Sequence, residues 1–303
     1  MEPGLLHFFI SGEESQVFPD SNLWKVPLSG GGTDKFHTTP SKNKSRDPVI
    51  TIGDYFSAAG QFLSENDFSK LSAGLENVLN RPVLNHEFER IILSLEKHGS
   101  FYHPLKIQVV LKGNRTCFFV LNGAVSGPGM GLIEKEYQLI SGLNKMYSKH
   151  YLPEVFGVDS VKTDKGRVGF FLGEWFEDYK EFHATEDLGK RQIVIWESDG
   201  RCHYMSENTA LPIYQEIARI LTYYYDIETF EQSFPWHHAA GDFIVKQEDD
   251  KIHVRMITVR GYSPLTEFSG QDENKTIHIL PALLFFFLNL TLRIRIDRLN
   301  GTG

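Results

Sequence analysis

Two adjacent histidines and an aspartate stand in one short segment, Pro235–Val245, with the sequence PWHHAAGDFIV. A histidine near neutral pH can act as a general base, contact a phosphate or ligate a metal, so His237 and His238 are catalytic candidates. Asp242 follows Gly241 at the start of an apolar run, where a carboxylate either caps a turn or serves in a site as a metal ligand. Adjacent residues of an extended segment point to opposite faces, which argues against both histidines holding one metal.

The other reactive residue types form no catalytic pattern. Cys117 stands inside a strand pattern and Cys202 near a hairpin turn, and neither has a local base that would activate a thiol. The motifs GxSxG, HExxH and CxxC do not occur. The glycines of GPGMG (residues 127–131) match no phosphate loop and indicate a tight connection from a strand to a helix.

The spacing of apolar side chains predicts the elements that position these residues. Between residues 52 and 98 apolar residues recur every three or four positions, which predicts two or three short amphipathic helices, the last over Phe88–Leu95. Leu105–Leu111 and Thr116–Leu121 alternate instead and form a hairpin, after which a helix and two more strands complete a β-β-α-β-β unit up to residue 172. We therefore expect a small antiparallel sheet with one packed helix.

An acidic, aromatic stretch, Glu174–His183, is typical of a connector between two lobes. Beyond it we expect a hairpin within residues 190–205, a helix over Leu211–Tyr225, and a strand at the end of Phe234–Val245 that pairs with His253–Val259. The fold class is α+β, two-lobed, with a helical N-terminal extension. The expected divisions are a flexible arm (1–48), N-terminal helices and a small β-rich lobe (49–173), a hinge (174–182) and a larger, mainly helical lobe (183–303).

The order of these elements over about residues 105–292 resembles the protein-kinase-like fold, most closely its branch of aminoglycoside and choline phosphotransferases. In that family a lysine on the third strand grips the nucleotide phosphates, and a glutamate on the next helix pairs with it. A loop of the pattern HGD-x-x-x-x-N carries the catalytic aspartate and a metal-binding asparagine. A second aspartate, one hairpin away, binds Mg²⁺.

In the small lobe, the resemblance implies two ligand-binding positions. The strand sequence FVLNGA (Phe119–Ala124) has Asn122 where the family has its lysine. In the helix sequence EKEYQLISGL (Glu134–Leu143), Glu136 takes the position of the helix glutamate. The alternative is that Glu136 is simply solvated or salt-bridged, as glutamates on amphipathic helices commonly are. The sequence EWFEDY then resembles the hinge.

In the larger lobe, His237 takes the position of the catalytic aspartate and Asp242 that of the metal-binding asparagine. Thr258, within MITVRGY, takes the position of the second metal aspartate. Arg260 follows, and its guanidinium suits either an anionic ligand or a structural carboxylate partner. Because phosphoryl transfer depends on electrostatic clamping of the phosphates, these replacements imply that any binding of Mg²⁺ and ATP is weak.

The apolar segment Ile279–Leu292 is the one stretch to weigh as a membrane helix. It has 14 residues, includes Pro281 and Asn289, and is shorter than the roughly 20 residues that cross a bilayer. We expect no membrane span but a helix buried in the larger lobe, and the alternative is a helix lying at a membrane interface. The residues expected to be buried are Leu283, Leu284, Phe287 and Leu290.

The composition bounds the partners and the compartment. With 31 Lys and Arg against 39 Asp and Glu, the chain of 303 residues has a net charge of −8, which argues against a nucleic-acid partner. Two cysteines cannot build a disulfide scaffold, so a reducing cytoplasm is expected. No basic segment precedes the short apolar patch at Leu5–Ile10, so no secretory signal is expected.

Three functions remain open on the sequence. The first is a kinase-like domain that lacks the ordinary kinase residues and binds a small anionic ligand or a protein partner as a binding or regulatory module. The second is an active, atypical phosphotransferase or nucleotidyl transferase that uses His237 or His238 together with Asp242. The third is an interaction protein of an unrelated α+β fold. Nucleotide turnover separates the first two, and stabilisation by nucleotides separates both from the third.

Overall fold

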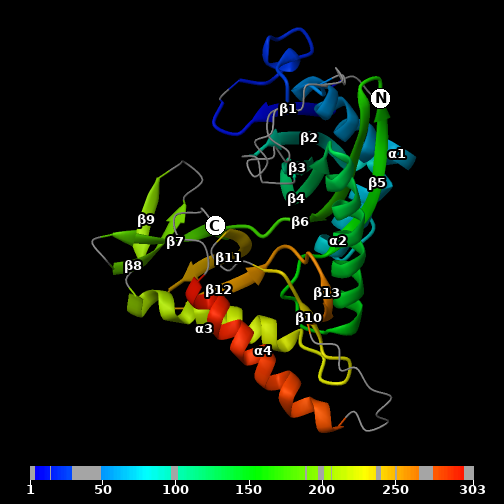
Figure 1. Cartoon of the computed structure of the whole chain (residues 1–303). Helices are drawn as coiled ribbons and strands as arrows, with labels where there is room; N and C mark the ends of the chain where they lie inside the picture. The colour runs from blue at the N-terminus through cyan, green and yellow to red at the C-terminus, as the bar shows by residue number, and fades with distance from the viewer. Residues whose placement is uncertain are drawn as a thin grey trace, which may run out of the picture. The chain divides into compact units, whose positions relative to one another are not determined.

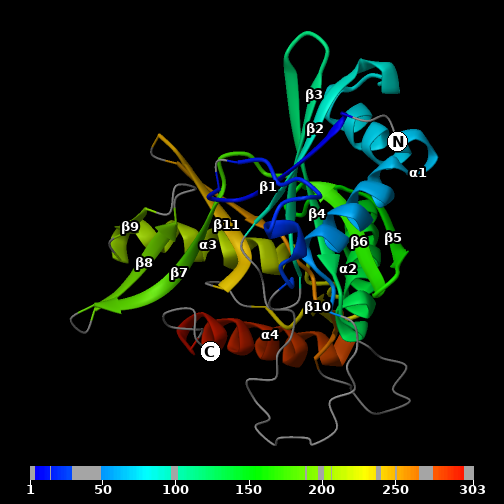
Figure 2. The same ribbon diagram turned by 90° about the horizontal axis from the view of Figure 1, so that it is seen from above.

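The computed structural model has an α+β fold, with four α-helices and a mixed sheet among the residues that it describes (Figures 1 and 2). It describes residues 4–13, 15–28, 49–96, 102–187, 190–196, 201–205, 207–236, 240–249, 251–265 and 276–296. By their contacts the residues divide into two compact units. The first comprises Met1–Tyr137 and Glu154–Trp175, and the second comprises Gln138–Pro153 and Phe176–Gly303.

The first unit is built on a six-stranded sheet. In spatial order its strands are β1 (Leu6–Ile10), β2 (Phe88–Leu95), β3 (Leu105–Leu111), β4 (Arg115–Ala124), β6 (Gly166–Glu174) and β5 (Val155–Thr163). β1 runs parallel to β2, and every other neighbouring pair is antiparallel. The β3–β4 and β5–β6 hairpins agree with the sequence expectation, because alternating apolar residues and a glycine-containing turn define each of them locally.

Two helices accompany this sheet. α1 (Ile52–Leu79) begins at a capping box formed by Thr51 and Asp54, and its backbone leaves the helical region at residues 65–68. It packs on β4, β5 and β6. Its largest buried side chains are Tyr55, Phe56, Phe62, Leu63, Leu71 and Leu75. α2 (Gly127–Met146) begins within the GPGMG sequence, where the Ser126 hydroxyl accepts a hydrogen bond from the Gly129 N–H at 3.1 Å.

Three residues of the stretch 15–28 pack in the core of the first unit, Val17, Trp24 and Leu28, so the prediction of an unpacked arm over residues 1–48 is wrong for them. Val17 is buried, and the Trp24 ring lies 5.6 Å from the Phe8 ring and 6.1 Å from the Phe56 ring. The apolar residues here have no regular spacing, and Phe18, Leu23 and Val26 are exposed, so the sequence does not indicate which of them pack. Residues 29–48 lie outside the described part.

The last helix predicted between residues 52 and 98 is instead strand β2, which pairs with both β1 and β3. Ile91, Leu93 and Leu95 are buried at every second position, which is the period of a strand. Apolar residues also recur in this segment at three- and four-residue spacing, so its sequence fits both patterns. The described residues of the stretch 52–98 therefore hold one long helix and the strand β2, and the stretch expected to be an arm holds the strand β1.

The second unit is not mainly helical, contrary to the sequence expectation. Its five-stranded sheet has the order β12 (Lys251–Met256), β11 (Ala240–Glu248), β7 (Lys180–Asp187), β8 (Lys190–Trp196) and β9 (Cys202–Met205). β10 (Glu231–Ser233) pairs separately with β13 (Tyr262–Pro264). Because β7 begins at Lys180, the last residues of the expected hinge are strand.

Helix α3 (Glu207–Tyr223) packs along β12. Ile213, Ile217 and Ile220 form its buried side, whereas Leu211 is exposed. Tyr224, just beyond the helix, is fully buried.

Helix α4 (Thr276–Ile296) differs from its prediction in length and in burial. It has 21 residues, and Thr276–Arg293 is, within the described helices, the one stretch long and apolar enough to cross a membrane. Length therefore does not exclude a span, although core helices of water-soluble proteins meet the same criterion. Leu284 and Phe287 are exposed, so the predicted burial is wrong for both, whereas Leu290 is buried as expected.

Candidate functional site

Asp242 lies in β11 at an irregular point of the strand. The register between β11 and β7 shifts between Ala240 and Ile244, and Gly241 has a φ of +83°, a value that glycine adopts readily. Such bulges turn a side chain away from the regular ladder. The Asp242 side chain is 1% exposed, and its Oδ1 accepts a hydrogen bond from Arg260 Nη2 at 2.5 Å.

The segment that carries Thr258 and Arg260 lies directly beside Asp242. The Ile257 N–H donates to the Asp242 carbonyl oxygen at 2.9 Å, and Thr258 follows at the next position. The structure therefore brings together Asp242, Thr258 and Arg260, which lie on the two sides of the β11–β12 hairpin. Arg260 and Asp242 form an ion pair. A structural carboxylate partner is one of the two roles that the sequence left open for Arg260.

The loop that leads to the two histidines is anchored against the same segment. The Phe234 N–H donates to the Gly261 carbonyl at 3.0 Å, and a Cβ added at Gly261 would lie 2.5 Å from the Phe234 carbonyl oxygen. Trp236 is buried, with its ring 6.5 Å from the Phe243 ring. His237 and His238 themselves lie outside the described residues.

Glu136 is a buried residue of α2 in the first unit. Its side chain is 3% exposed, and Oε2 accepts a hydrogen bond from the Tyr102 hydroxyl at 2.5 Å. The Tyr102 ring is also in edge contact with Phe171 of β6 at 6.4 Å. The family resemblance implies a lysine partner for this glutamate. In this structure Glu136 is hydrogen-bonded to the Tyr102 hydroxyl. Tyr102 was missed because it belongs to no periodic pattern.

Asn122 lies on the same face of the sheet as α2. Residues two apart in a strand share a face, and Ala124 packs with Ile133 of α2 and with Phe171. Asn122 is directly opposite Phe171 in the β4–β6 pairing, which places it on that face too. Asn122 and Glu136 therefore occupy one side of the first unit, and Asp242, Thr258 and Arg260 belong to the second unit.

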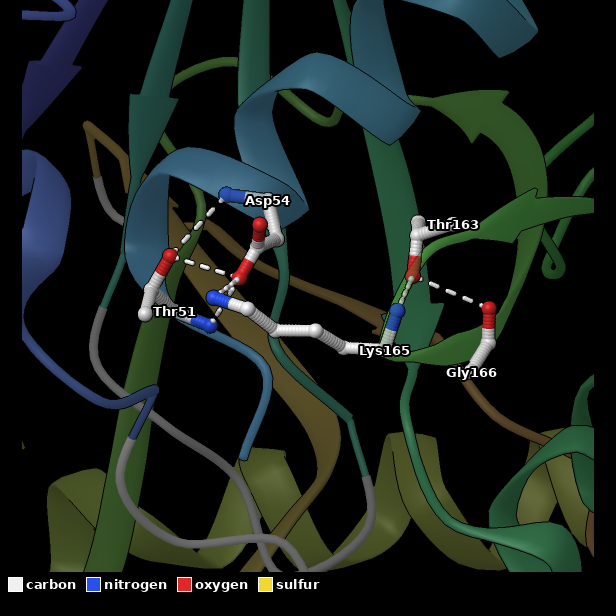
Figure 3. A network of polar contacts seen from close by, with 5 residues as sticks. All are labelled: Thr51, Asp54, Thr163, Lys165 and Gly166. Atoms are coloured by element: carbon white, nitrogen blue, oxygen red, sulfur yellow. Dashed lines mark hydrogen bonds and ion pairs between the residues drawn. The ribbon is translucent and has the colours of Figure 1, made fainter. Parts of the chain in front are cut away.

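A polar network at the start of α1 was not predicted (Figure 3). Asp54 Oδ2 accepts from the Thr51 N–H and from Lys165 Nζ, each at 2.7 Å. The Lys165 N–H donates to the Thr163 hydroxyl at 3.2 Å, and this hydroxyl donates to the Gly166 carbonyl at 2.9 Å. The network joins the β5–β6 turn to the helix start, which is a structural role. Its sequence signal is Thr-x-x-Asp, a form of capping box.

The pKa of Asp54 reflects two opposing effects in this network. Burial alone raises it by disfavouring the charged carboxylate, but the hydrogen bonds from Lys165 and Thr51 outweigh burial, so the pKa lies below its ordinary value. The carboxylate is therefore the form that the folded protein favours.

Two surface cavities of the second unit lie away from the candidate residues. One, of about 630 Å³, is lined by residues of β7, β8, β9 and β11, including Lys180 and His203, and by Asp178, which precedes β7. The other, of about 360 Å³, lies between α3 and β12 and includes Arg219 and Arg255. Asp242, Thr258 and Arg260 line neither of these two cavities.

The described residues hold no cluster of metal ligands. Among them, no three His, Cys, Asp or Glu side chains gather as a set of metal ligands. The carboxylate at the implied metal position, Asp242, is instead paired with a guanidinium. Comparison of the sequence with protein-family models and with curated proteins finds no match.

Proposed function

We propose that this chain is a kinase-like domain that lacks the ordinary kinase residues and serves as a binding or regulatory module. The ion pair between Asp242 and Arg260 carries the proposal. In a phosphotransferase of this kind a ligand at the position of Asp242 would face Mg²⁺. A guanidinium beside a buried carboxylate neutralises its charge and repels a divalent cation, so this pairing weakens Asp242 as a metal ligand.

The element order of the first unit supports the resemblance. β2 and β3 form an antiparallel pair, β4 is the third strand of that succession, α2 follows, and β5 and β6 complete the sheet. β2 was predicted to be a helix, and with it included β6 is the fifth strand after β1. The chain leaves the sheet at Glu174, the last residue of β6, where the resemblance implies a hinge. The β7–β9 strands before α3 are a departure from the pattern.

The residues of the first unit at the positions that bind phosphates in that family also support a loss of catalysis. β4, with the sequence RTCFFVLNGA, contains no lysine, and Asn122 takes the implied lysine position. Glu136 is hydrogen-bonded to Tyr102. A nucleoside triphosphate would therefore lack the lysine contact that it has in that family.

Calorimetric titration of the full chain with Mg²⁺–ATP at pH 6 and pH 8 tests the proposal. Each missing charge-assisted contact weakens binding by about 1.5–3 kcal/mol, so two lower the affinity by roughly two to four powers of ten. We expect millimolar or weaker binding and ATP hydrolysis at background. Residual binding of pyrophosphate should strengthen below about pH 6.5 and be lost in the variant His237→Ala/His238→Ala, because imidazole gains charge there.

Two outcomes contradict the proposal and point to the alternatives. Micromolar, pH-independent ATP binding that Asp242→Ala abolishes, with turnover, would favour the active transferase that uses His237 or His238. Complete indifference of the melting temperature to ATP, ADP and pyrophosphate at both pH values would favour an interaction protein of unrelated fold.

A further inference from the structure

Helix α4 exposes a continuous apolar face. Six large side chains, each between 47% and 77% exposed, fall within about 140° of arc at 100° per residue. They are Ile277, Leu280, Leu284, Phe287, Leu288 and Leu292. These six residues are called the α4 face below. Figures 1 and 2 draw α4 as one unbroken helix in orange and red.

The opposite side of α4 already has its contacts within the second unit. Phe286 is 4% exposed, and its ring lies 4.6 Å from the Tyr225 ring. The Arg293 guanidinium lies over the Phe234 ring, 4.3 Å from its centroid. The helix is therefore attached along one side, and the α4 face is turned away from that attachment.

The chemistry of the α4 face suits burial in a dry interface. Between Ile277 and Leu292 this arc otherwise holds only Pro281 and Thr291, neither of which is charged, and Arg295 follows on it at the end of the helix. The Thr291 hydroxyl donates to the helix's own carbonyls, to Phe287 O at 2.8 Å and Leu288 O at 3.0 Å. Covering the arc between Ile277 and Leu292 would leave no side-chain donor there unsatisfied.

We propose that the α4 face pairs with the α4 face of a second copy of this chain. Six such side chains at about half exposure present on the order of 600 Å² of apolar surface, beyond what isolated surface residues give a monomer. A stable interface buries about 800 Å² per partner, so this face supplies most of the area that a two-fold dimer needs. The inference is independent of the proposed function.

An antiparallel arrangement follows from the charges at the helix end. Arg295 follows on the same arc, about one turn beyond Leu292, and a parallel pair would bring this arginine of both copies together. An antiparallel pair separates them and also opposes the two helix dipoles favourably. Leu284 lies close to the midpoint of the face, so it would meet its own counterpart across the two-fold axis.

A membrane surface fits the same face less well. An interfacial helix keeps its other side polar and in water, whereas the other side of α4 contacts Tyr225 and Phe234. The net charge of −8 also opposes approach of the whole chain to anionic lipid.

Sedimentation velocity of the full chain between 1 and 100 µM tests the pairing. We expect a dimer in the wild type, and the variant Leu284→Lys/Leu288→Lys should weaken its association by roughly 100-fold or more, because two buried leucines become charged. Leu211→Lys changes an equally exposed leucine on α3 and should leave the dimer unchanged. Unchanged circular dichroism of each variant shows that its fold is intact.

A crosslink identifies the interface. In a Cys202→Ser background, which removes the exposed native thiol, Leu284→Cys should form an intermolecular disulfide on mild oxidation. A mixture of Ile277→Cys and Leu292→Cys chains should crosslink to each other in the antiparallel pair. A wild type that stays monomeric at 100 µM, or a dimer indifferent to Leu284→Lys/Leu288→Lys, overturns the proposal. Co-flotation of such a monomer with phosphatidylcholine–phosphatidylserine vesicles would assign the face to lipid.

Discussion

Arg260 approaches Asp242 to 2.5 Å from a segment 18 residues further along the chain, and the two side chains differ sharply in exposure. The Asp242 side chain is 1% exposed, whereas the Arg260 side chain is 30% exposed. Arg260 therefore keeps contact with water while it neutralises the Asp242 carboxylate, which is shielded from water. Removing the arginine should cost more than the net contribution of the pair, because it leaves a buried carboxylate without its counter-ion.

Arg260→Ala should lower the free energy of unfolding by about 2–3 kcal/mol, the low end for a broken buried pair because the guanidinium is partly solvated. Urea unfolding at pH 7 measures the change. The double variant Asp242→Asn/Arg260→Ala should lose less than the sum of its two single variants, since no buried charge remains. Additive losses would mean that the ion pair contributes nothing as a pair.

Tyr102→Phe should destabilise the first unit by about 1–2 kcal/mol, because it removes a hydrogen bond to a buried carboxylate without changing the packing of the ring. The donor lies 2.5 Å from Glu136 Oε2. Tyr204→Phe is the matched control, since Tyr204 is exposed and the change should leave the unfolding midpoint within error. Equal effects of the two substitutions would show that the Glu136 contact does not matter for stability.

The parts of the fold that were predictable are those defined by neighbours in the sequence. The β3–β4 hairpin turns at Gly113 and Asn114, both of which have positive φ, and its strands alternate on either side. β2 was mistaken for a helix because its identity depends on β1 and β3. Ile91 pairs with Leu6 on one side and Val109 on the other, and neither partner is near it in sequence.

The contacts of the candidate residues could not be predicted from the sequence. Asp242 and Arg260 were each recognised from their positions beside apolar strands, but their pairing depends on how the β11–β12 hairpin folds back. The exposed side of α4 was hidden for a different reason. A helix that is apolar nearly all round has little amphipathic pattern, so the sequence does not indicate which side is covered.

Gly53→Ala should destabilise the protein by about 1–3 kcal/mol, as overpacked core positions do. A Cβ at Gly53 would lie 2.1 Å from Trp24 Nε1, so the indole ring would have to move out of its place beside Phe8 and Phe56. Gly131→Ala in α2 is the control, because a Cβ there meets nothing within 4 Å. The control should stabilise the helix by about 0.5–1 kcal/mol. A harmless Gly53→Ala would separate residues 15–28 from the core.

Two adjacent phenylalanines of α4 should respond very differently to truncation. Phe286 is 4% exposed and Phe287 is 47% exposed. Phe286→Ala should cost about 2–4 kcal/mol through the cavity that it leaves, and Phe287→Ala less than about 1 kcal/mol in the monomer. Thermal unfolding at concentrations well below the dimer dissociation constant gives both values. A larger loss for Phe287→Ala would mean that α4 is rotated about its axis from the arrangement described.

The Asp54–Lys165 contact should make stability depend on pH in the acid range. The pKa of Asp54 is depressed in the folded protein, so the unfolded chain takes up the proton first as the pH falls. Its contribution is present above about pH 4, the value for the unfolded chain, and is lost as the pH falls through the lower pKa of the folded state. The difference in stability between the wild type and Asp54→Asn should therefore be about 1 kcal/mol at pH 7, typical of a helix cap, and shrink below about pH 4.

Lys165→Met separates the ion pair from the capping box, because Thr51 still donates to Asp54 when the lysine is gone. It should raise the pKa of Asp54 toward the ordinary value, as followed by carboxyl carbon shifts in an NMR titration, and leave the start of α1 helical. Glu76→Gln changes an exposed carboxylate on the same helix and should alter neither the Asp54 titration nor the slope of stability against pH. If Asp54 titrates at the same pH with and without Lys165, the capping hydrogen bonds from Thr51 alone hold its pKa down, and the turn between β5 and β6 is not fastened to α1 by charge.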